Sequence, residues 1–309
     1  MNLNIVVNKF SMKRAAETTT LRTSSKKGKL EESNPHTLDD RLSFKEEGHI
    51  YFWDGDDIKD IGGTSSTTFI KKFFTPFNPQ HCIRSITRSR KYLTDPTYKY
   101  YKKTNQEILD MWAQNRDEAA DAGTRFHLDI ELSYNGIDVE NDTKEWGQFQ
   151  KFESLRDKEM KPFRTEWMIY DTELRLAGSM DMVFKNADGT YSIYDWKRSK
   201  AIKIKDSKKG NFPLEHVSDC NFMHYSLQLN LYKYILEKNY GVQISSLVLV
   251  VCHPLQNGFR KIVCPEMQEE IKDMLDLRRL SLFKHSYITL GSLGLTPDEA
   301  REIDWTSIP

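Results

Sequence analysis

GSMDMVFKNADGTYSIYDWK, the stretch from residue 178 to residue 197, holds two runs of alternating apolar and polar residues with a turn between them. The turn is Asn-Ala-Asp-Gly at 186–189, a composition typical of a tight hairpin connection. An alternation of period two is typical of β-strands. We therefore predict antiparallel strands over 175–184 and 191–196, side by side at the centre of the fold.

Three charged residues lie within these apolar strands. Antiparallel pairing brings Asp181 beside Asp195, and Lys197 shares a face with Asp195 because residues i and i+2 of a strand point the same way. Burying such charges costs several kcal/mol per ion unless they are paired or bound to a metal. Adjacent carboxylates suit Mg²⁺ or Mn²⁺, and an ammonium group beside them can orient a water or stabilise charge on phosphorus. The pattern predicts a hydrolytic metal site.

The flanking sequence predicts an α/β fold in which helices cover a central mixed β-sheet. Further strands are expected over 163–170 and 246–252, the latter an apolar run typical of a buried strand. A short hairpin is expected over 49–58, with an acidic glycine turn. The spacing of apolar residues predicts helices over 64–74, 116–134, 143–158 and 217–239.

The helix before the central strands carries a candidate further ligand. Gly123 and Thr124 precede His127, and Glu131 shares a helix face with His127 because the two are four residues apart. A single histidine on a helix is more often structural than functional, so both interpretations of His127 stand on these residues alone.

Two more features accompany this set. Gln228 and Tyr232 share one face of the helix after Lys197, and Glu166 lies in the strand before Asp181. Glutamine and tyrosine also suit many ordinary helix faces, and Glu166 also fits a solvated strand position.

Together these motifs resemble the PD-(D/E)xK nuclease superfamily, and within it the RecB-type branch, from about residue 45 to residue 260. Asp181 followed by Asp195-Trp196-Lys197 is similar to the superfamily's metal-binding element. GTRFHLDIE at 123–131 and QLNLY at 228–232 are similar to the branch's helical histidine and Q-x-x-x-Y elements. The closest resemblance is to mitochondrial genome maintenance exonucleases and related viral and phage exonucleases.

The resemblance implies which residues do the chemistry. The metal ligands, for one or two Mg²⁺ or Mn²⁺ ions, would be His127, Asp181, Asp195 and the backbone carbonyl of Trp196. Lys197 would act with Asp181, Asp195 and Glu166 in catalysis. Gln228 and Tyr232 would contact substrate or support the site, Ser179 would contact substrate, and Thr124 and Glu131 would support the site. No iron–sulfur cluster is expected, because the C-terminal cysteine cluster of some branch members is absent.

Two segments concentrate positive charge. Residues 79–118 are expected to be largely helical and interleave basic residues with Tyr92, Tyr98, Tyr100 and Tyr101; the basic residues are Arg84, Arg88, Arg90, Lys91, Lys99, Lys102 and Lys103. The loop after Lys197 contains Arg198, Lys200, Lys203, Lys205, Lys208 and Lys209. Basic groups bind phosphates and aromatic faces stack on unpaired bases, so Arg84, Arg88, Arg198 and Lys200 are candidate substrate contacts. Solvated helix faces and a mobile loop are the alternative.

Composition and length set the domain organisation. We expect a disordered basic tail over 1–40 and one catalytic domain over 41–309, with a helical arch or wall at about 79–118, a catalytic core at about 119–260 and a helical tail at 261–309. Net charge is zero, from 45 basic and 45 acidic residues, so overall charge neither supports nor excludes a nucleic-acid partner.

The tail and the cysteines bear on localisation. Lys13-Arg14 and Lys26-Lys27-Gly28-Lys29 resemble a bipartite nuclear signal; a mitochondrial transit peptide is the alternative, and the acidic residues of the tail count against it. The four cysteines form no CxxC pair and are expected to be reduced in an intracellular protein. No apolar run is long enough to predict a membrane segment.

These features predict a Mg²⁺- or Mn²⁺-dependent deoxyribonuclease, with exonuclease action on single-stranded DNA favoured, in DNA replication, repair or recombination. Replication or recombination proteins are the expected protein partners. The alternatives are an endonuclease of the same fold, a catalytically silent nucleic-acid-binding or recombination protein, and a metal-dependent hydrolase of another substrate.

Overall fold

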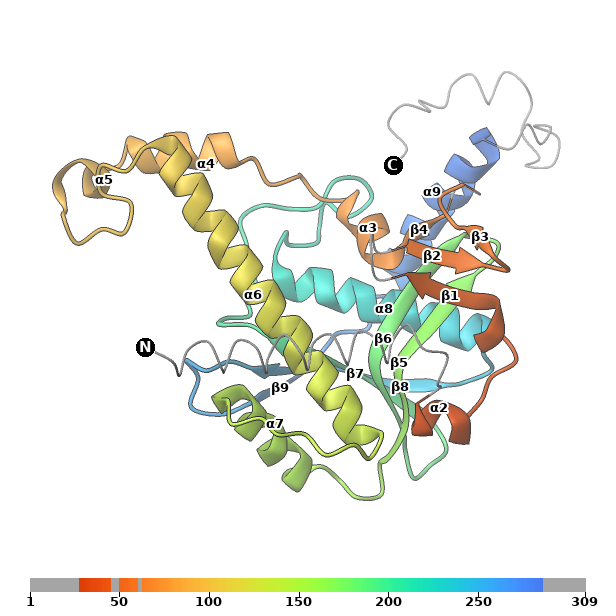
Figure 1. Cartoon of the computed structure of the whole chain (residues 1–309). Coiled ribbons are helices and arrows are strands. Elements are labelled where there is room, and N and C mark those ends of the chain that lie inside the picture. The colour runs from red at the N-terminus through yellow and green to blue at the C-terminus, as the bar shows by residue number, and fades with distance from the viewer. Residues whose placement is uncertain (1–27, 46–49, 61–62, 286–309) are drawn as a thin grey trace, which may run out of the picture.

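The computed structural model describes residues 28–45, 50–60 and 63–285 (Figure 1). The two basic clusters of the tail therefore lie outside the described residues, except for Gly28 and Lys29. The end of the expected helical tail, from residue 286 to residue 309, also lies outside them. Within the described residues, no helix combines the length and the apolar character that a membrane span requires.

A mixed β-sheet forms the centre of the molecule, as the strand pattern predicts. Its order is β4-β6-β7-β8-β9, and β5 pairs with the second edge of β6. The strands are β4 (Thr64–Ser65), β5 (Lys161–Asp171), β6 (Leu176–Lys185), β7 (Tyr191–Arg198), β8 (Ile244–Cys252) and β9 (Arg260–Val263). The hairpin β6–β7 is antiparallel, whereas β7 and β8 are parallel. The expected α/β architecture with a central mixed sheet is confirmed.

The pairing along β6 leaves part of one edge open. β5 pairs with β6 from residue 176 to residue 185, so β4 and β7 share the other edge. β4 pairs there at 176–177 and β7 at 182–185. Residues 178–181 lie between these two ladders, and within the described chain no strand pairs with their free edge. Asp181 lies in this gap.

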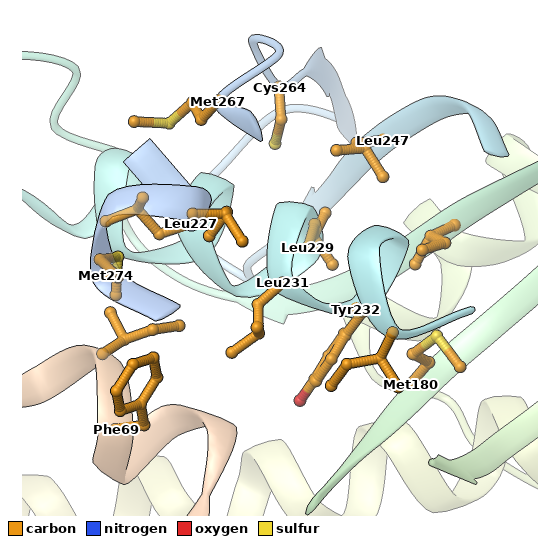
Figure 2. Packing of buried hydrophobic residues seen from close by; sticks show 14 of the residues in the cluster. Phe69, Met180, Leu227, Leu229, Leu231, Tyr232, Leu247, Cys264, Met267 and Met274 are labelled. Carbon is orange, nitrogen blue, oxygen red and sulfur yellow. The ribbon is translucent and has the colours of Figure 1, made fainter. Parts of the chain in front are cut away.

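Helices pack on both faces of the sheet. On one face, α3 (Ser66–Lys71), α8 (Asn221–Asn239) and α9 (Gln268–His285) bury a large apolar cluster against β6, β7 and β8; Figure 2 shows part of it, with Tyr232 of α8 beside Met180. On the other face, α6 (Asn105–Tyr134) and α7 (Lys144–Leu155) bury Phe126, Phe149 and Phe152 against Tyr194 and Trp196.

Helix α6 is longer than the sequence pattern predicts. We expected a separate helix at 116–134, but one helix of 30 residues begins at Asn105 and crosses the boundary at 118–119 between the expected arch and core. A capping box starts it: Thr104 Oγ1 accepts from Glu107 N at 3.2 Å, and Thr104 N donates to Glu107 Oε2 at 2.6 Å. Gly123 lies inside the helix without ending it, because one glycine costs only about 1 kcal/mol there.

The chain before the sheet departs from the expected disordered tail. Residues 28–41 contain α2 (Lys29–Ser33) and a 3₁₀ turn at Asp39–Arg41. Arg164 of β5 donates to the carbonyl of Asn34 at 2.9 Å and to Asp39 Oδ2 at 2.8 Å, and Trp167 Nε1 donates to Asp39 Oδ1 at 3.1 Å. A few polar contacts to β5 thus order a segment whose composition alone favours disorder. The expected hairpin follows, as β1 (Leu42–Lys45), β2 (Ile50–Trp53) and β3 (Asp56–Asp57).

An arm projects from this body. It consists of α4 (Pro79–Thr87), α5 (Arg90–Thr94) and the first half of α6, which extend away from the sheet (Figure 1). Ile83, Tyr100 and Ile108 form a small core of their own inside the arm. The expected helical arch or wall at 79–118 corresponds to this element.

Candidate metal centre

The centre lies at the open edge of β6, where three strands and α6 meet. Asp181 stands in β6, and Glu166 lies opposite it in β5, between the pairs Thr165↔Met182 and Trp167↔Met180. The ladder between β6 and β7 ends at Met182↔Tyr194, one residue before Asp181 and Asp195. Strands β6 and β7 separate beyond this pair, so the carboxylates of Asp181 and Asp195 lie at the gap between the two strands.

Helix α6 brings His127 to Asp181. His127 Nδ1 lies 3.4 Å from Asp181 Oδ2. Burial lowers the pKa of His127, but the charge and hydrogen bond of Asp181, together with the charge of Glu166, outweigh burial and raise that pKa to about 9. For Asp181, burial raises the pKa, while His127, Lys197 and the Trp196 N–H lower it by a larger amount. At neutral pH these two groups therefore form a charged pair.

Asp195 and Lys197 form a second buried pair, as their i, i+2 spacing predicts. Lys197 Nζ lies 2.5 Å from Asp195 Oδ2. Burial raises the pKa of Asp195 to about 6; Lys197 opposes this shift and the nearby charge of Asp181 adds to it. Burial lowers the pKa of Lys197, but the two aspartates raise it above its usual range. Lys197 is therefore an ammonium donor at neutral pH.

Glu166 completes the cluster of ligand atoms. Within the described residues, ligand atoms of His127, Glu166 and Asp181 lie within 4.8 Å of one another. Glu166 adopts a left-handed backbone with φ of 44°, and its Oε2 accepts from Ser179 Oγ at 3.2 Å. The sequence favours Asp195 as the third ligand, whereas the geometry groups Glu166 with His127 and Asp181, and Asp195 Oδ2 lies 2.5 Å from Lys197 Nζ.

The residues fit a divalent cation. Asp195 Oδ2 is buried and receives no hydrogen bond of acceptable geometry, even with Lys197 Nζ at 2.5 Å. Three carboxylates and one imidazole form a donor set rich in oxygen, which suits Mg²⁺ or Mn²⁺. Trp196 N donates to Asp181 Oδ2 at 2.7 Å. Because the N–H and C=O of one strand residue point to the same neighbour, the Trp196 carbonyl faces the same gap.

Gln228 and Tyr232 lie beneath this centre. Gln228 Nε2 donates to Tyr232 Oη at 2.8 Å, and the Tyr232 ring is buried. Burial and the nearby charges of Asp195 and Asp181 are among the causes that raise the pKa of Tyr232. The ring packs on Gly178 so closely that a Cβ there would lie 2.4 Å from Tyr232 Cε1. This position favours support of β6, one of the two roles that the resemblance implies.

Other predicted residues lie away from the cluster. Arg198 points to the opposite face of β7, where its Nε donates to Glu145 Oε1 of α7 at 2.6 Å. Its odd spacing from Lys197 predicts this orientation, since successive strand residues alternate faces. Lys200 is exposed in the following loop, and Thr124 is exposed on α6. Arg84 and Arg88 are exposed on α4, in the arm; Glu131 is partly buried on α6.

One site residue was missed by the sequence pattern. Lys197 Nζ lies 4.7 Å from the centroid of the Tyr225 ring. Tyr225 precedes Gln228 by three residues in α8, so helical spacing already puts it near the Q-x-x-x-Y face. A cavity of about 530 Å³ lies elsewhere, at the turn between β6 and β7, lined by residues that include Phe152, Asn186 and Lys261; none of the clustered residues lines it.

Comparison with known proteins supports the superfamily. The family model of the PD-(D/E)XK nuclease superfamily matches residues 143–282, which include Glu166, Asp181, Asp195 and Lys197. The match suggests a metal-dependent nuclease, and the described sheet and helices are consistent with the restriction-endonuclease-like fold.

Two further searches add little to this match. The search among curated proteins finds no match. Among solved structures, the crystal structure of SSO0001 is 14% identical, covering 50% of this chain and 68% of its own, with a TM-score of 0.22. At this level of similarity it carries no conclusion about function.

Proposed function

We propose that the protein is a Mg²⁺- or Mn²⁺-dependent deoxyribonuclease of the RecB-type branch, acting as an exonuclease that prefers single-stranded DNA. The observation that carries the proposal is the convergence of His127, Glu166 and Asp181 with the Lys197–Asp195 pair at the open edge of β6. Such a set of acids, a histidine and a charged lysine suits hydrolysis of a phosphodiester.

Each residue has a role that follows from its charge and position. His127, Asp181, Asp195 and Glu166 would hold the cation, which when bound supplies Lewis-acid polarisation of the phosphate and a lower pKa for water. Lys197 stays protonated because two aspartates raise its pKa, so it donates hydrogen bonds instead of acting as a base. It can orient the attacking water or stabilise the charge that develops on phosphate oxygens.

The preference for a single strand rests on the arm. Arg84 and Arg88 are exposed there and can hold phosphates. Lys200 and Lys205 are exposed in the loop after β7 and can do the same near the metal centre. An exonuclease that threads one strand past the arm toward Asp181 would use both surfaces.

A cleavage assay with end-labelled DNA tests the proposal. Linear single strands, duplexes and circular single strands are incubated with Mg²⁺, Mn²⁺ or chelator. We expect degradation of linear single strands only with metal, and loss of about 10²-fold or more in Lys197→Ala, the range typical of a positioned donor or acid–base group. Lys272→Ala is the matched control, since this exposed lysine of α9 lies outside the cluster, the arm and the loop after β7.

The alternatives give different outcomes in the same assay. Efficient cleavage of circles favours an endonuclease. Salt-sensitive binding of DNA without cleavage favours a catalytically silent nucleic-acid-binding or recombination protein. Full activity of Lys197→Ala contradicts the assignment of the centre.

A further inference from the structure

The tyrosines of the arm are engaged in its own folding. Tyr100 is buried, and Trp112 Nε1 donates to its hydroxyl at 2.6 Å. Tyr92 Oη donates to the carbonyl of Lys103 at 2.9 Å, and the Tyr98 ring packs edge-on against Tyr100 at 5.4 Å. The expectation that tyrosines of the arm stack on bases is therefore wrong for Tyr92, Tyr98 and Tyr100, because these three rings pack in the small core of the arm.

One aromatic side chain next to the arm is largely exposed to solvent. Phe77, in the segment between α3 and α4, is 71% exposed. Its ring contacts Trp112 of α6 edge-on at 5.9 Å between centroids, and the bond to Tyr100 fixes the Trp112 ring. Exposure of a phenylalanine ring to water is unfavourable. Here the exposed Phe77 ring packs against the Trp112 ring, whose position is fixed. We call this pair the Phe77–Trp112 platform.

The chain segment that carries the platform is rich in basic residues. Residues 77–115 contain seven basic and three acidic side chains, in a chain whose net charge is zero. The acids are engaged locally: Asp95 accepts from Thr97, Glu107 belongs to the capping box, and Asp110 accepts from Gln106. In the described part of the chain none of the seven basic groups forms a salt bridge; they are Arg84, Arg88, Arg90, Lys91, Lys99, Lys102 and Lys103. The charge is therefore available to a polyanion.

Helix α6 sets the distance between the platform and the metal centre. Trp112 and His127 belong to the same helix and are 15 residues apart, which at about 1.5 Å per residue is roughly 22 Å. A stacked strand rises about 3.4 Å per nucleotide and an extended strand about twice that, so this distance corresponds to roughly three to six nucleotides.

We propose that the Phe77–Trp112 platform stacks on an unpaired base of the substrate strand, roughly three to six nucleotides from the scissile phosphate, while Arg84 and Arg88 hold the flanking phosphates. This inference rests on the proposed function and adds to it the place where the arm grips the strand. Base–aromatic stacking tolerates any sequence, because every base has an aromatic face. The occupant is a single-stranded nucleic acid, since excess positive charge surrounds an exposed ring.

Affinity measurements on the full chain with chelator present test the platform without cleavage. Labelled 20-nucleotide strands of deoxythymidine and of uridine report binding of DNA and of RNA. We expect Phe77→Ala to raise Kd by roughly 5- to 150-fold, the range for loss of one stacked base, and Phe77→Trp to keep the wild-type affinity. Leu155→Ala is the matched control, because Leu155 is 64% exposed at the end of α7, outside the arm.

Two modified strands make the test specific. A strand of abasic residues carries the same phosphates without bases, so Phe77→Ala should not change its Kd. Dinucleotides bound at the metal centre are too short to reach the platform, so the ratio of mutant to wild-type Kd should approach one. Trp112 fluorescence should be quenched by the 20-nucleotide strand, and Trp112→Phe should remove that quenching; the other described tryptophans are buried.

Several outcomes overturn the inference. Wild-type affinity of Phe77→Ala for the base-containing strand means that no base stacks there. An equal loss of affinity for the abasic strand means that Phe77 acts through the fold of the arm. If the wild-type protein binds no strand at low salt, the surface does not bind nucleic acid and a protein partner is favoured. Failure of the proposed function would look different: the platform effect on Kd would remain, while the wild-type protein would show no metal-dependent cleavage.

Discussion

Gly178→Ala tests the contact between α8 and β6, the strand that carries Asp181. The new Cβ would lie 2.4 Å from Tyr232 Cε1, 3.0 Å from Tyr232 Cζ and 3.0 Å from Ser66 Oγ. Carbon atoms pack at about 3.5–4.0 Å, so the ring must move by about 1 Å. Tyr232 is buried and accepts from Gln228 at 2.8 Å, so it cannot move without disturbing its neighbours.

The expected cost combines overpacking with a weakened hydrogen bond. Overpacking costs about 1–3 kcal/mol and one hydrogen bond about 1 kcal/mol, so Gly178→Ala should lower the free energy of unfolding by about 2–4 kcal/mol. Urea unfolding of the metal-free protein measures this as a lower midpoint with an unchanged slope. Because Gly178 is three residues from Asp181, we also expect kcat to fall by about 10²-fold, the effect of a displacement of about 1 Å at a reacting centre.

A double-mutant cycle separates this steric reasoning from a general sensitivity of β6. In a Tyr232→Ala background the ring is absent, so adding the Gly178 methyl group should cost less than about 1 kcal/mol. A cost of Gly178→Ala below about 0.5 kcal/mol in the wild-type background would refute the reasoning, and so would an equal cost in both backgrounds.

Three further predictions concern other parts of the chain. Gly123→Ala should stabilise the protein by up to about 1 kcal/mol in urea unfolding, since no atom lies within 4 Å of the new Cβ in helix α6; destabilisation would contradict this placement. Thr104→Ala removes the cap of α6 and should speed amide hydrogen exchange in its first turn by about 5-fold, for a loss of about 1 kcal/mol; unchanged exchange would show that the capping box with Glu107 is absent. Burial raises the pKa of Asp39, but Arg164, the His36 N–H and Trp167 together lower it by more. This carboxylate therefore stabilises the fold above its unfolded pKa of about 3.9 and loses that effect as pH falls through its lower folded pKa. Asp39→Asn should therefore cost about 3–5 kcal/mol at pH 7 and progressively less below about pH 4, and a cost independent of pH would contradict the pair.

The central strands and most of the candidate site residues follow from the sequence, because they depend on local periodicity. Alternation of period two across a tight turn predicts β6 and β7, and the i, i+2 rule predicts that Asp195 and Lys197 pair. The same alternation places Arg198 on the opposite face. Residues four apart on a helix share a face, which predicts that Gln228 and Tyr232 meet.

Other features were decided only by the tertiary structure, because they depend on segments far apart in the chain. Glu166 joins His127 and Asp181 only because β5 pairs with β6 and α6 crosses beside them.

Tertiary contacts also decided the structure of the segments around the candidate site. Residues 28–41 are ordered by contacts to β5 that their polar composition does not predict. In the arm, basic and aromatic residues alternate along the sequence, but packing alone decides that Tyr100 is buried and that Phe77 remains exposed. Spacing along one strand or helix determines which way a side chain points, whereas burial depends on what the rest of the chain places against it.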